Sequence, residues 1–291
     1  MLDFILQPRS TRVHLVLVLL ITMLIAVADT IVPSSARAEA LVVVNPGFED
    51  ISGESVVNEF TFGPLNGWDL YDPGAITGGG AGGVYFLGTL TPFESDPIGQ
   101  PGVFVNFPDG APEGQRLGIA FNFFGSGGGG EWGFEQVLVD TLQPNTAYTL
   151  QVDVGDIASG TAMSGQNFVL DGFPGYRVEM RAGGELVAAD DNTLAATLAD
   201  GEFMTSTVAF TTGSEPLPQS GVLSIRLVSL NTVDPDFPAS DLEVDFDNVR
   251  LDASAAAVPV PALAAKSRGT LLVALLSAGS VLVLRRSRSR L

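Results

Sequence analysis

Cysteine is absent from this sequence of 291 residues, and the single histidine, His14, lies in the N-terminal segment. If that segment is removed on export, the mature protein has neither residue. This excludes Ser-His-Asp and Cys-His nucleophilic catalysis, and also zinc sites built from histidine and cysteine. Proton transfer must then use Asp, Glu or Tyr. A bound metal would be a hard ion held by oxygen atoms, and Ca²⁺ is the favoured one.

Positive charge is scarce in the long central part of the chain. Residues 39–257 contain five arginines, no lysine and 31 acidic residues, which gives a net charge of −26. A surface this acidic repels nucleic acid and anionic lipid, so the sequence predicts no nucleic-acid partner. Divalent cations are the natural counter-ions.

The start of the chain has the order of a secretory signal. Arg9 and Arg12 precede an apolar run, Leu15–Ala28, and small residues follow it. This order predicts cleavage after Ala38 or Ala40. The alternative is a membrane anchor that is never cleaved.

The end of the chain combines a proline motif, a short apolar stretch and a basic terminus. Val258-Pro-Val-Pro261 precedes the uncharged stretch Leu271–Leu284, and four arginines follow between Arg285 and Arg290. As a helix the uncharged stretch covers roughly 21 Å, less than the roughly 30 Å hydrocarbon core of a membrane. The tail resembles the PEP-CTERM class of bacterial C-terminal sorting signals, with Val-Pro-Val-Pro in place of Val-Pro-Glu-Pro. That resemblance implies processing by a membrane protease of the exosortase type.

Between these ends, residues 39–257 predict one large all-β domain. The clearest strand is Tyr148–Val154, where apolar residues alternate with Thr, Gln and Asp. Outside the termini a helical turn is predicted only at Leu194–Leu198. We expect a jelly-roll β-sandwich of two antiparallel sheets, flanked by a signal helix (1–38) and a short hydrophobic C-terminal helix (258–291). Further strands are predicted at Leu117–Phe124, Trp132–Leu138, Gly175–Arg181, Phe203–Thr211 and Val222–Leu230.

The last predicted strand carries three acidic residues at every second position. Glu243, Asp245 and Asp247 share one face, while Val244 and Phe246 share the other. Like charges this close repel one another, and their unpaired burial is costly. A metal ion, a shared proton or solvent would each offset the repulsion. The apolar pattern also changes parity here, which indicates a β-bulge that would put Asp245 and Asp247 on different faces, one as metal ligand and the other as acid.

The two ends of the domain resemble jelly-roll domains of the carbohydrate-binding-module type. Those begin with Asn-x-x-Phe-Glu, here Asn45-Pro-Gly-Phe-Glu49 at the opening of the first strand, and end with the pattern seen in Phe246-Asp-Asn-Val249. The resemblance implies neighbouring first and last strands, and a structural Ca²⁺ held by Glu49 and Asp247. The alternative is a solvated Glu49 and an Asx turn at Asp247.

Several internal segments are similar to the Stig cyclases, exported jelly-roll proteins of cyanobacteria that cyclise isonitrile indole-terpenoids. That family requires Ca²⁺ and uses an aspartic acid as proton donor in an aromatic pocket. The resemblance covers most of residues 42–252 and makes Asp245 the candidate acid. The alternative is an ordinary buried, hydrogen-bonded aspartate. The matching segments are Gly67–Pro73, Ala111–Gln115, Leu142–Gly155, Phe173–Glu179, Glu202–Val208 and Glu243–Leu251.

Aromatic residues are concentrated in the first half of the domain. Most are predicted to belong to the core. Trp68, Tyr71 and Trp132 lie next to turns or loops, and we predict that they form a ligand surface that stacks on sugars or stabilises a carbocation.

Together these features predict a signal peptide (1–38), a calcium-binding jelly-roll (39–257) and a sorting tail (258–291). The main interpretation is an exported carbohydrate-binding-module-like surface or matrix protein. It would lie in the cell envelope or outside it, and would pass through an inner-membrane intermediate during export. Its partners would be a glycan or a small apolar or aromatic ligand, and the sorting protease. The alternatives are a calcium-dependent Stig-type cyclase and a structural protein without a ligand. An enclosed apolar pocket with one inward acid would favour the cyclase, and an open groove with exposed rings the glycan binder.

Overall fold

The computed structural model describes residues 38–63, 65–92, 107–123, 128–214 and 221–256. The predicted signal and sorting segments therefore lie outside the described residues, apart from Ala38. Within these ranges, no helix has the length and apolar character needed to cross a bilayer. The strands are β1 (Glu39–Leu41), β2 (Val56–Val57), β3 (Phe60–Phe62), β4 (Asp69–Tyr71), β5 (Ala81–Gly82), β6 (Tyr85–Leu90), β7 (Leu117–Asn122), β8 (Trp132–Thr141), β9 (Thr146–Asp156), β10 (Gly160–Thr161), β11 (Asn167–Phe168), β12 (Tyr176–Ala182), β13 (Glu185–Asp191), β14 (Glu202–Thr211), β15 (Val222–Ser229) and β16 (Leu242–Ala255).

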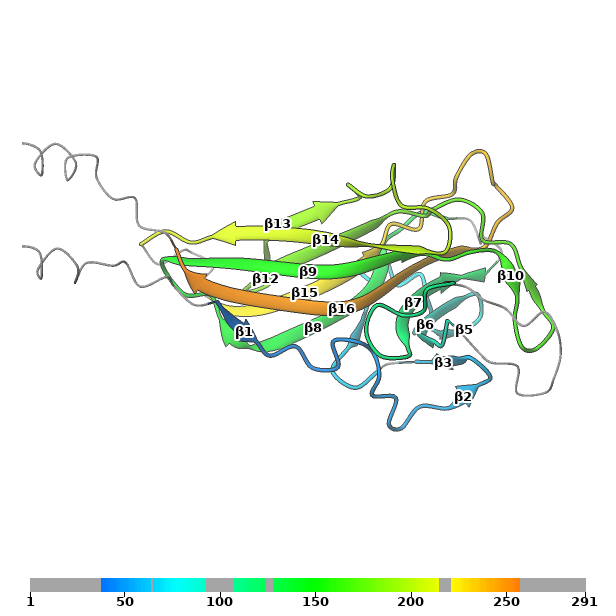
Figure 1. Cartoon of the computed structure of the whole chain (residues 1–291), viewed down its shortest axis with the longest axis horizontal. Helices are drawn as coiled ribbons and strands as arrows, with labels where there is room; N and C mark the ends of the chain where they lie inside the picture. Colours follow the sequence, from blue (N-terminus) through cyan, green and yellow to red (C-terminus); the bar gives the residue numbers. More distant parts are fainter. Residues whose placement is uncertain (1–37, 64, 93–106, 124–127, 215–220, 257–291) are drawn as a thin grey trace, which may run out of the picture. The chain divides into compact units, whose positions relative to one another are not determined.

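Two antiparallel sheets make up the described domain, which confirms the predicted all-β jelly-roll class. The larger sheet has the order β14-β9-β16-β7-β6-β3-β2, with β1 beside β16 and β5 beside β6. The smaller sheet has the order β13-β12-β15-β8-β4, and β10 and β11 form a separate hairpin. Figure 1 shows β14, β9 and β16 side by side in front of the smaller sheet.

The inner core fills the space between the two sheets. Leu150 and Val152 of β9 are fully buried in it, as are Val178 and Met180 of β12. This placement follows from strand geometry, because alternate residues of each strand point to the same face. The alternation read in Tyr148–Val154 therefore predicted the buried face of β9 correctly.

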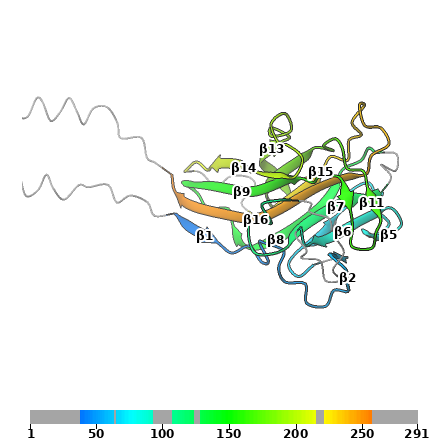
Figure 2. The same ribbon diagram turned by 45° about the vertical axis from the view of Figure 1, so that its right-hand side comes forward.

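A second apolar cluster lies on the opposite face of the larger sheet, and we call it the outer cluster. Leu117, Ile119 and Phe121 of β7 project into it, whereas the intervening Ala120 faces the inner core. Phe60, Phe86 and Phe168 pack against its edge. The larger sheet is thus apolar on both faces near β3, β6 and β7, and the β10–β11 hairpin lies close to this end in Figure 2.

The predicted β-bulge lies in β16. The pairing of β16 with β9 shifts register between Asp247 and Arg250, and Asn248 has a φ of 52°. Asparagine tolerates this left-handed conformation better than most residues. The shift restores Val249 and Leu251 to the inner core. Glu243, Asp245 and Asp247 precede the bulge and all remain on the outer-cluster face, so the expectation that the bulge puts Asp245 and Asp247 on different faces was wrong.

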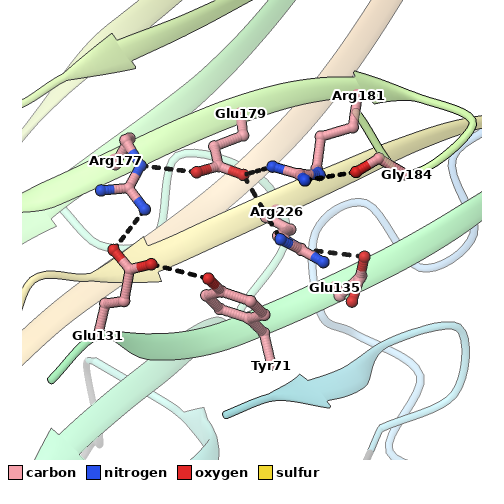
Figure 3. Close-up of polar contacts among 8 residues, drawn as sticks. All are labelled: Tyr71, Glu131, Glu135, Arg177, Glu179, Arg181, Gly184 and Arg226. Carbon is pink, nitrogen blue, oxygen red and sulfur yellow. Dashed lines mark hydrogen bonds and ion pairs between the residues drawn. The ribbon is translucent and has the colours of Figure 1, made fainter. Parts of the chain in front are cut away.

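An ion-pair network covers the outer face of the smaller sheet (Figure 3). Arg177 and Arg181 of β12 donate to the Glu179 carboxylate between them, each at 2.7 Å. Arg226 of β15 donates to Glu135 of β8 at 3.0 Å. Three of the domain's five arginines are therefore paired on this one face. The network comprises Tyr71, Glu131, Glu135, Arg177, Glu179, Arg181 and Arg226.

The first and last strands are neighbours, as the sequence resemblance implied. Glu39 pairs with Ala253, and Leu41 with Leu251. The first strand nevertheless ends before the Asn45–Glu49 motif, which forms a turn closed by a hydrogen bond from Phe48 N to Asn45 O. The expectation that this motif opens the first strand was therefore wrong, because Asn45 and Phe48 both take positive φ values that a strand cannot accommodate.

Candidate active site

A cavity of about 370 Å³ lies over the outer face of the larger sheet. Its floor includes Phe121 of β7, and Phe168 of the β10–β11 hairpin contributes a wall. The volume falls in the range of about 300–1,000 Å³ typical of small-ligand sites. The lining residues are Val57, Asn58, Phe60, Phe62, Gly83, Phe86, Phe121, Phe123, Ile157, Ser164, Gln166, Phe168, Leu170 and Glu243.

Six of the fourteen residues that line the cavity are phenylalanines. The ring centroids of Phe62 and Phe86 lie 5.0 Å apart, and those of Phe121 and Phe168 lie 5.6 Å apart in an edge-to-face contact. These are preferred aromatic geometries, and they hold the wall in place. The face of an aromatic ring carries the negative part of its quadrupole and attracts cations, so a wall rich in phenylalanine suits an aromatic or cationic guest.

The β10–β11 hairpin is fastened to the β2–β3 hairpin across this cavity. Met163 N donates to Glu59 Oε1 at 2.9 Å, and Glu59 is buried. Asn58 precedes this glutamate and Ser164 follows this methionine, and both line the cavity. The two hairpins together therefore form one side of the site.

Glu243 is the ionisable residue that lines the cavity. Its side chain comes from the start of β16, opposite Phe121 of β7. Glu243 is only 5% exposed, and its Oε1 atom has no hydrogen-bond partner. Burial raises the pKa of the Glu243 carboxyl well above its ordinary value; a hydrogen bond with Asp245 acts in the opposite direction, and the charge of Asp241 adds to the increase.

Asp245 lies behind Glu243 and does not line the cavity. It is 0% exposed, and burial, the Glu243 carboxyl and the charge of Asp156 all raise its pKa. Neither of its oxygens has a hydrogen-bond partner among the contacts of the structure. Two ionised carboxylates cannot bond to each other, since both only accept. The raised pKa values of Glu243 and Asp245 favour a shared proton, the second of the three alternatives that the sequence left open.

Asp247 lies farther along the same strand face, in a different environment. Its Oδ2 accepts from Glu113 N and its Oδ1 from Asn248 N, both at 2.7 Å. Burial raises the pKa of Asp247 to about 8, the two backbone hydrogen bonds lower it, and the charges of Glu113 and Asp153 raise it. The backbone just after Glu113 binds a second carboxylate, because Gln115 N donates to Glu49 Oε1 at 2.6 Å.

Asp247 and Glu49 are the two carboxylates that the sequence resemblance assigned to calcium. A Cβ atom placed on Gly47 would lie 1.5 Å from Glu113 Oε2 and 3.5 Å from Asp247 Oδ1, so both oxygens converge over this glycine. The donors are all oxygens, as Ca²⁺ prefers. No group of three or more His, Cys, Asp or Glu side chains in the described ranges is arranged to hold a metal by itself. Backbone carbonyls or water would have to complete the six to eight ligands of Ca²⁺.

The three aromatic residues predicted to form a ligand surface do not line the cavity. Trp68 and Trp132 are buried in the inner core, where Phe48 stacks on Trp68 at 5.3 Å. Tyr71 lies in the ion-pair network, with its hydroxyl donated to Glu131 and its ring covered by Arg226 at 4.2 Å. The structure thus places none of the three rings in an open groove.

Sequence reasoning missed Glu113 and the cavity role of Glu243. Glu113 lies in the quoted Ala111–Gln115 segment, yet only the fold brings its backbone N–H to Asp247. Glu243 was recognised as sharing a face with Asp245. The signal that could have distinguished the two is position, since Glu243 is nearer to the end of its strand, where loops and hairpins form pockets.

Comparison with known proteins gives consistent matches. Residues 39–252 match the HpiC1-like family, described as HpiC1 cyclase. The structure of an apo cyclase from Fischerella sp. is 32% identical, covers 76% of this chain and 98% of that one, and has a TM-score of 0.60. The Stig cyclase Fisc from Fischerella sp. TAU, in complex with (3Z)-3-(1-methyl-2-pyrrolidinylidene)-3H-indole, is 31% identical over 76% and 100% of the two chains, with a TM-score of 0.59. A cyclase from Fischerella sp. TAU with bound 4-(1H-indol-3-yl)butan-2-one is 32% identical over the same shares, also with a TM-score of 0.59. Among curated proteins, none matches.

These matches correct the main interpretation drawn from the sequence. The prediction of a carbohydrate-binding-module-like surface or matrix protein is wrong, because the family and the similar structures are cyclases, two of them with indole ligands. The physical reason for the error is that the jelly-roll motifs at the domain ends report the scaffold, whereas function depends on the site that the scaffold carries.

Proposed function

The chain belongs to the HpiC1-like cyclase family, and on this premise we propose that it is a Stig-type cyclase that closes rings in an indole-terpenoid substrate by acid-initiated reaction. The observation that carries the proposal is a phenylalanine-lined cavity with the Glu243 carboxyl at its wall and the buried Asp245 directly behind it. Asp245 supplies the proton. The rings exclude water and stabilise the positive charge that protonation creates.

The cavity fits this chemistry better than it fits polar ligands. Glu243 is the acid at its wall, and Asn58, Ser164 and Gln166 are the remaining side chains with polar groups. An indole and a terpenoid chain present mainly apolar surface, which six phenylalanine side chains can bury. The indole ligands of the related Fischerella cyclases are consistent with such a substrate.

The direct test is to incubate the full chain with an isonitrile-bearing indole-terpenoid and to separate the products by chromatography with mass detection. A cyclisation conserves atoms, so the expected product has the mass of the substrate and a different retention time. No new isomer with any substrate of this class, from protein shown to be folded, would contradict the proposed function.

We also infer export from the signal order of residues 1–38 and sorting from the tail at 258–291. The proposed route places the domain of residues 39–257 outside the cytoplasm, with an exosortase-type protease as partner of the tail. This inference is supported by the sequence pattern of the two segments. Mass spectrometry of the protein recovered from the cell envelope would test it, since both segments should be missing from the mature chain.

Calcium is the proposed cofactor, held by Asp247 and Glu113 with Glu49 beside them. Bound there, Ca²⁺ would neutralise the carboxylates that gather where the first turn meets β16. The same residues would fasten the Asn45–Glu49 turn to the last strand. This role is structural, and it is separate from the cavity lined by Glu243.

Calcium is expected to raise the thermal stability of the full chain. A ligand that binds only the native state at about 100 times its Kd adds about 2.7 kcal/mol, which corresponds to a Tm increase of roughly 5–10 °C for a domain of this size. Thermal unfolding with Ca²⁺ and with a chelator measures the shift. Asp247→Ala should abolish it, and the matched change Asp252→Asn on the same strand should leave it intact. An equal shift in wild type and Asp247→Ala would exclude this site.

A further inference from the structure

The exposed side chains that line the cavity belong to the tips of two hairpins. Val57 and Asn58 come from the β2–β3 hairpin, and Ser164 and Gln166 come from the β10–β11 hairpin. By contrast, Phe121 on the floor of the cavity is only 7% exposed. A ligand that reaches the floor from solvent therefore passes these two tips.

The β10–β11 hairpin has little structure of its own to hold it over the cavity. Gly160 pairs with Phe168 and Thr161 with Asn167, and neither strand joins one of the two main sheets. Both views place it at the end of the domain where β5 and β7 lie (Figure 1 and Figure 2). An isolated two-stranded hairpin is at best marginally stable in water. Its position therefore depends on the contacts that fasten it to the rest of the domain.

Two contacts fasten the hairpin, one at a strand and one at the tip. The Phe168 ring packs edge-to-face on Phe121, with centroids 5.6 Å apart. At the tip, Met163 N donates to Glu59 Oε1 at 2.9 Å, and Glu59 is only 2% exposed. Within the described ranges, no other hydrogen bond joins the tip, residues 162–166, to another element. The tip can thus leave the β2–β3 hairpin when this one bond breaks.

We propose that the two hairpin tips form a gate over the cavity and that Glu59 is its latch. While Met163 N is bonded to Glu59 the gate is closed, and when the bond breaks the hairpin swings away and the cavity opens. Glu59 is a positioning residue, because it acts on the hairpin and does not itself line the cavity. The gate requires only that the cavity takes an indole-type ligand, whereas its effect on the products, described next, rests on the proposed function.

A closed gate protects the cation that the proposed reaction forms. Water that enters an open cavity adds to the cation: a C–O bond forms, and the added water gives up one proton, which replaces the proton taken from the acid. The result is an alcohol with the mass of the substrate plus one water. In a closed cavity the cation is consumed by ring closure, which conserves the mass of the substrate.

The experiment follows the binding of 4-(1H-indol-3-yl)butan-2-one to the full chain by stopped-flow indole fluorescence. Glu59→Leu keeps a side chain of similar size and removes the acceptor of the Met163 N–H. One net hydrogen bond corresponds to about fivefold in the equilibrium between the closed and open hairpin. The association and dissociation rate constants should therefore both rise about fivefold, while Kd changes less than about twofold, because a gate limits passage in both directions. Hydrogen exchange in peptides that cover residues 158–171 should become faster by the same factor.

Two further variants separate the latch from general destabilisation. Glu59→Gln keeps an acceptor oxygen, and its amide nitrogen would replace Oε2, which has no hydrogen-bond partner among the described residues. This variant should stay within about twofold of the wild type in every measurement. Glu135→Leu removes a carboxylate that accepts from Arg226 at 3.0 Å in the smaller sheet. It should leave the exchange of the hairpin and both rate constants unchanged.

The same variants give a chemical readout with an isonitrile-bearing indole-terpenoid as substrate. Glu59→Leu should raise the share of product that has the substrate mass plus water by about fivefold, since water reaches the cation only in open molecules. Glu59→Gln and Glu135→Leu should give the product distribution of the wild type.

The possible results distinguish the gate from the proposed function. Unchanged hydrogen exchange or unchanged rate constants in Glu59→Leu would overturn the gate and leave the proposed function standing. The same holds if Glu59→Gln changes as much as Glu59→Leu, or if only the dissociation rate constant rises, as for a lost ligand contact. A wild type that binds the probe through a gate opened by Glu59→Leu, yet forms no cyclised isomer, would contradict the proposed function and leave the gate standing.

Discussion

Replacing Asp245 with asparagine is expected to lower kcat for ring closure by about 10²–10⁴-fold while KM changes little. This is the usual contribution of a positioned general acid. Asparagine has nearly the same size as aspartate, but its amide cannot give up an acidic proton. Asp245 is completely buried and its oxygens have no hydrogen-bond partner, so the change removes the acidic proton and breaks no hydrogen bond.

The measurement is steady-state kinetics on an isonitrile-bearing indole-terpenoid, with the full chain and with Asp245→Asn. Glu131→Gln is the control, because it makes the same carboxyl-to-amide change at a residue of the ion-pair network that does not line the cavity (Figure 3). The control should keep its activity. Unchanged kcat in Asp245→Asn, with the fold verified by thermal unfolding, would show that the proton comes from elsewhere.

Local pattern predicted the strands well where one face of a strand is buried. Tyr148–Val154 became the centre of β9, and the face shared by Glu243, Asp245 and Asp247 was correct because alternation needs no tertiary information. The bulge in β16 was also visible as a change of parity. By contrast, β5 and β6 were hidden in a glycine-rich stretch, because two-residue strands and strands buried on both faces show no alternation.

The candidate site depended on contacts that the sequence does not encode locally. Trp68 and Trp132 lie beside turns, yet neighbouring elements cover both of them. The cavity requires the β10–β11 hairpin to close over β7, a contact between segments about 45 residues apart in sequence. Glu243 and Asp245 looked equivalent in the sequence, and only the structure shows that Glu243 lines the cavity whereas Asp245 does not.

Burial of unpaired carboxyl groups should also give this domain a distinctive pH dependence, most cleanly at Asp156. Burial, and secondarily the charge of Asp200, raises the pKa of Asp156 to about 7 from an ordinary value of 3.8. The folded state therefore binds a proton that the unfolded state has already lost between these two pH values. A raised carboxyl pKa contributes stability that is complete below pH 4 and is lost as the pH rises to 7.

Asp156→Asn removes this titration. When the pH is raised from 5 to 8, the unfolding free energy of the variant should therefore increase by about 2–3 kcal/mol relative to that of the wild type, at 1.36 kcal/mol per pKa unit. Urea unfolding of both proteins at the two pH values, in the presence of a chelator, gives this double difference. The contributions of Glu243 and Asp247 are common to both proteins and cancel, whereas the pKa of Asp245 is raised less in the variant because the charge of Asp156 is gone. Asp200→Asn, at an exposed neighbour, should give a smaller change of the same sign. Equal pH dependence in wild type and Asp156→Asn would mean that Asp156 stays ionised in the folded protein, with its charge compensated by its surroundings.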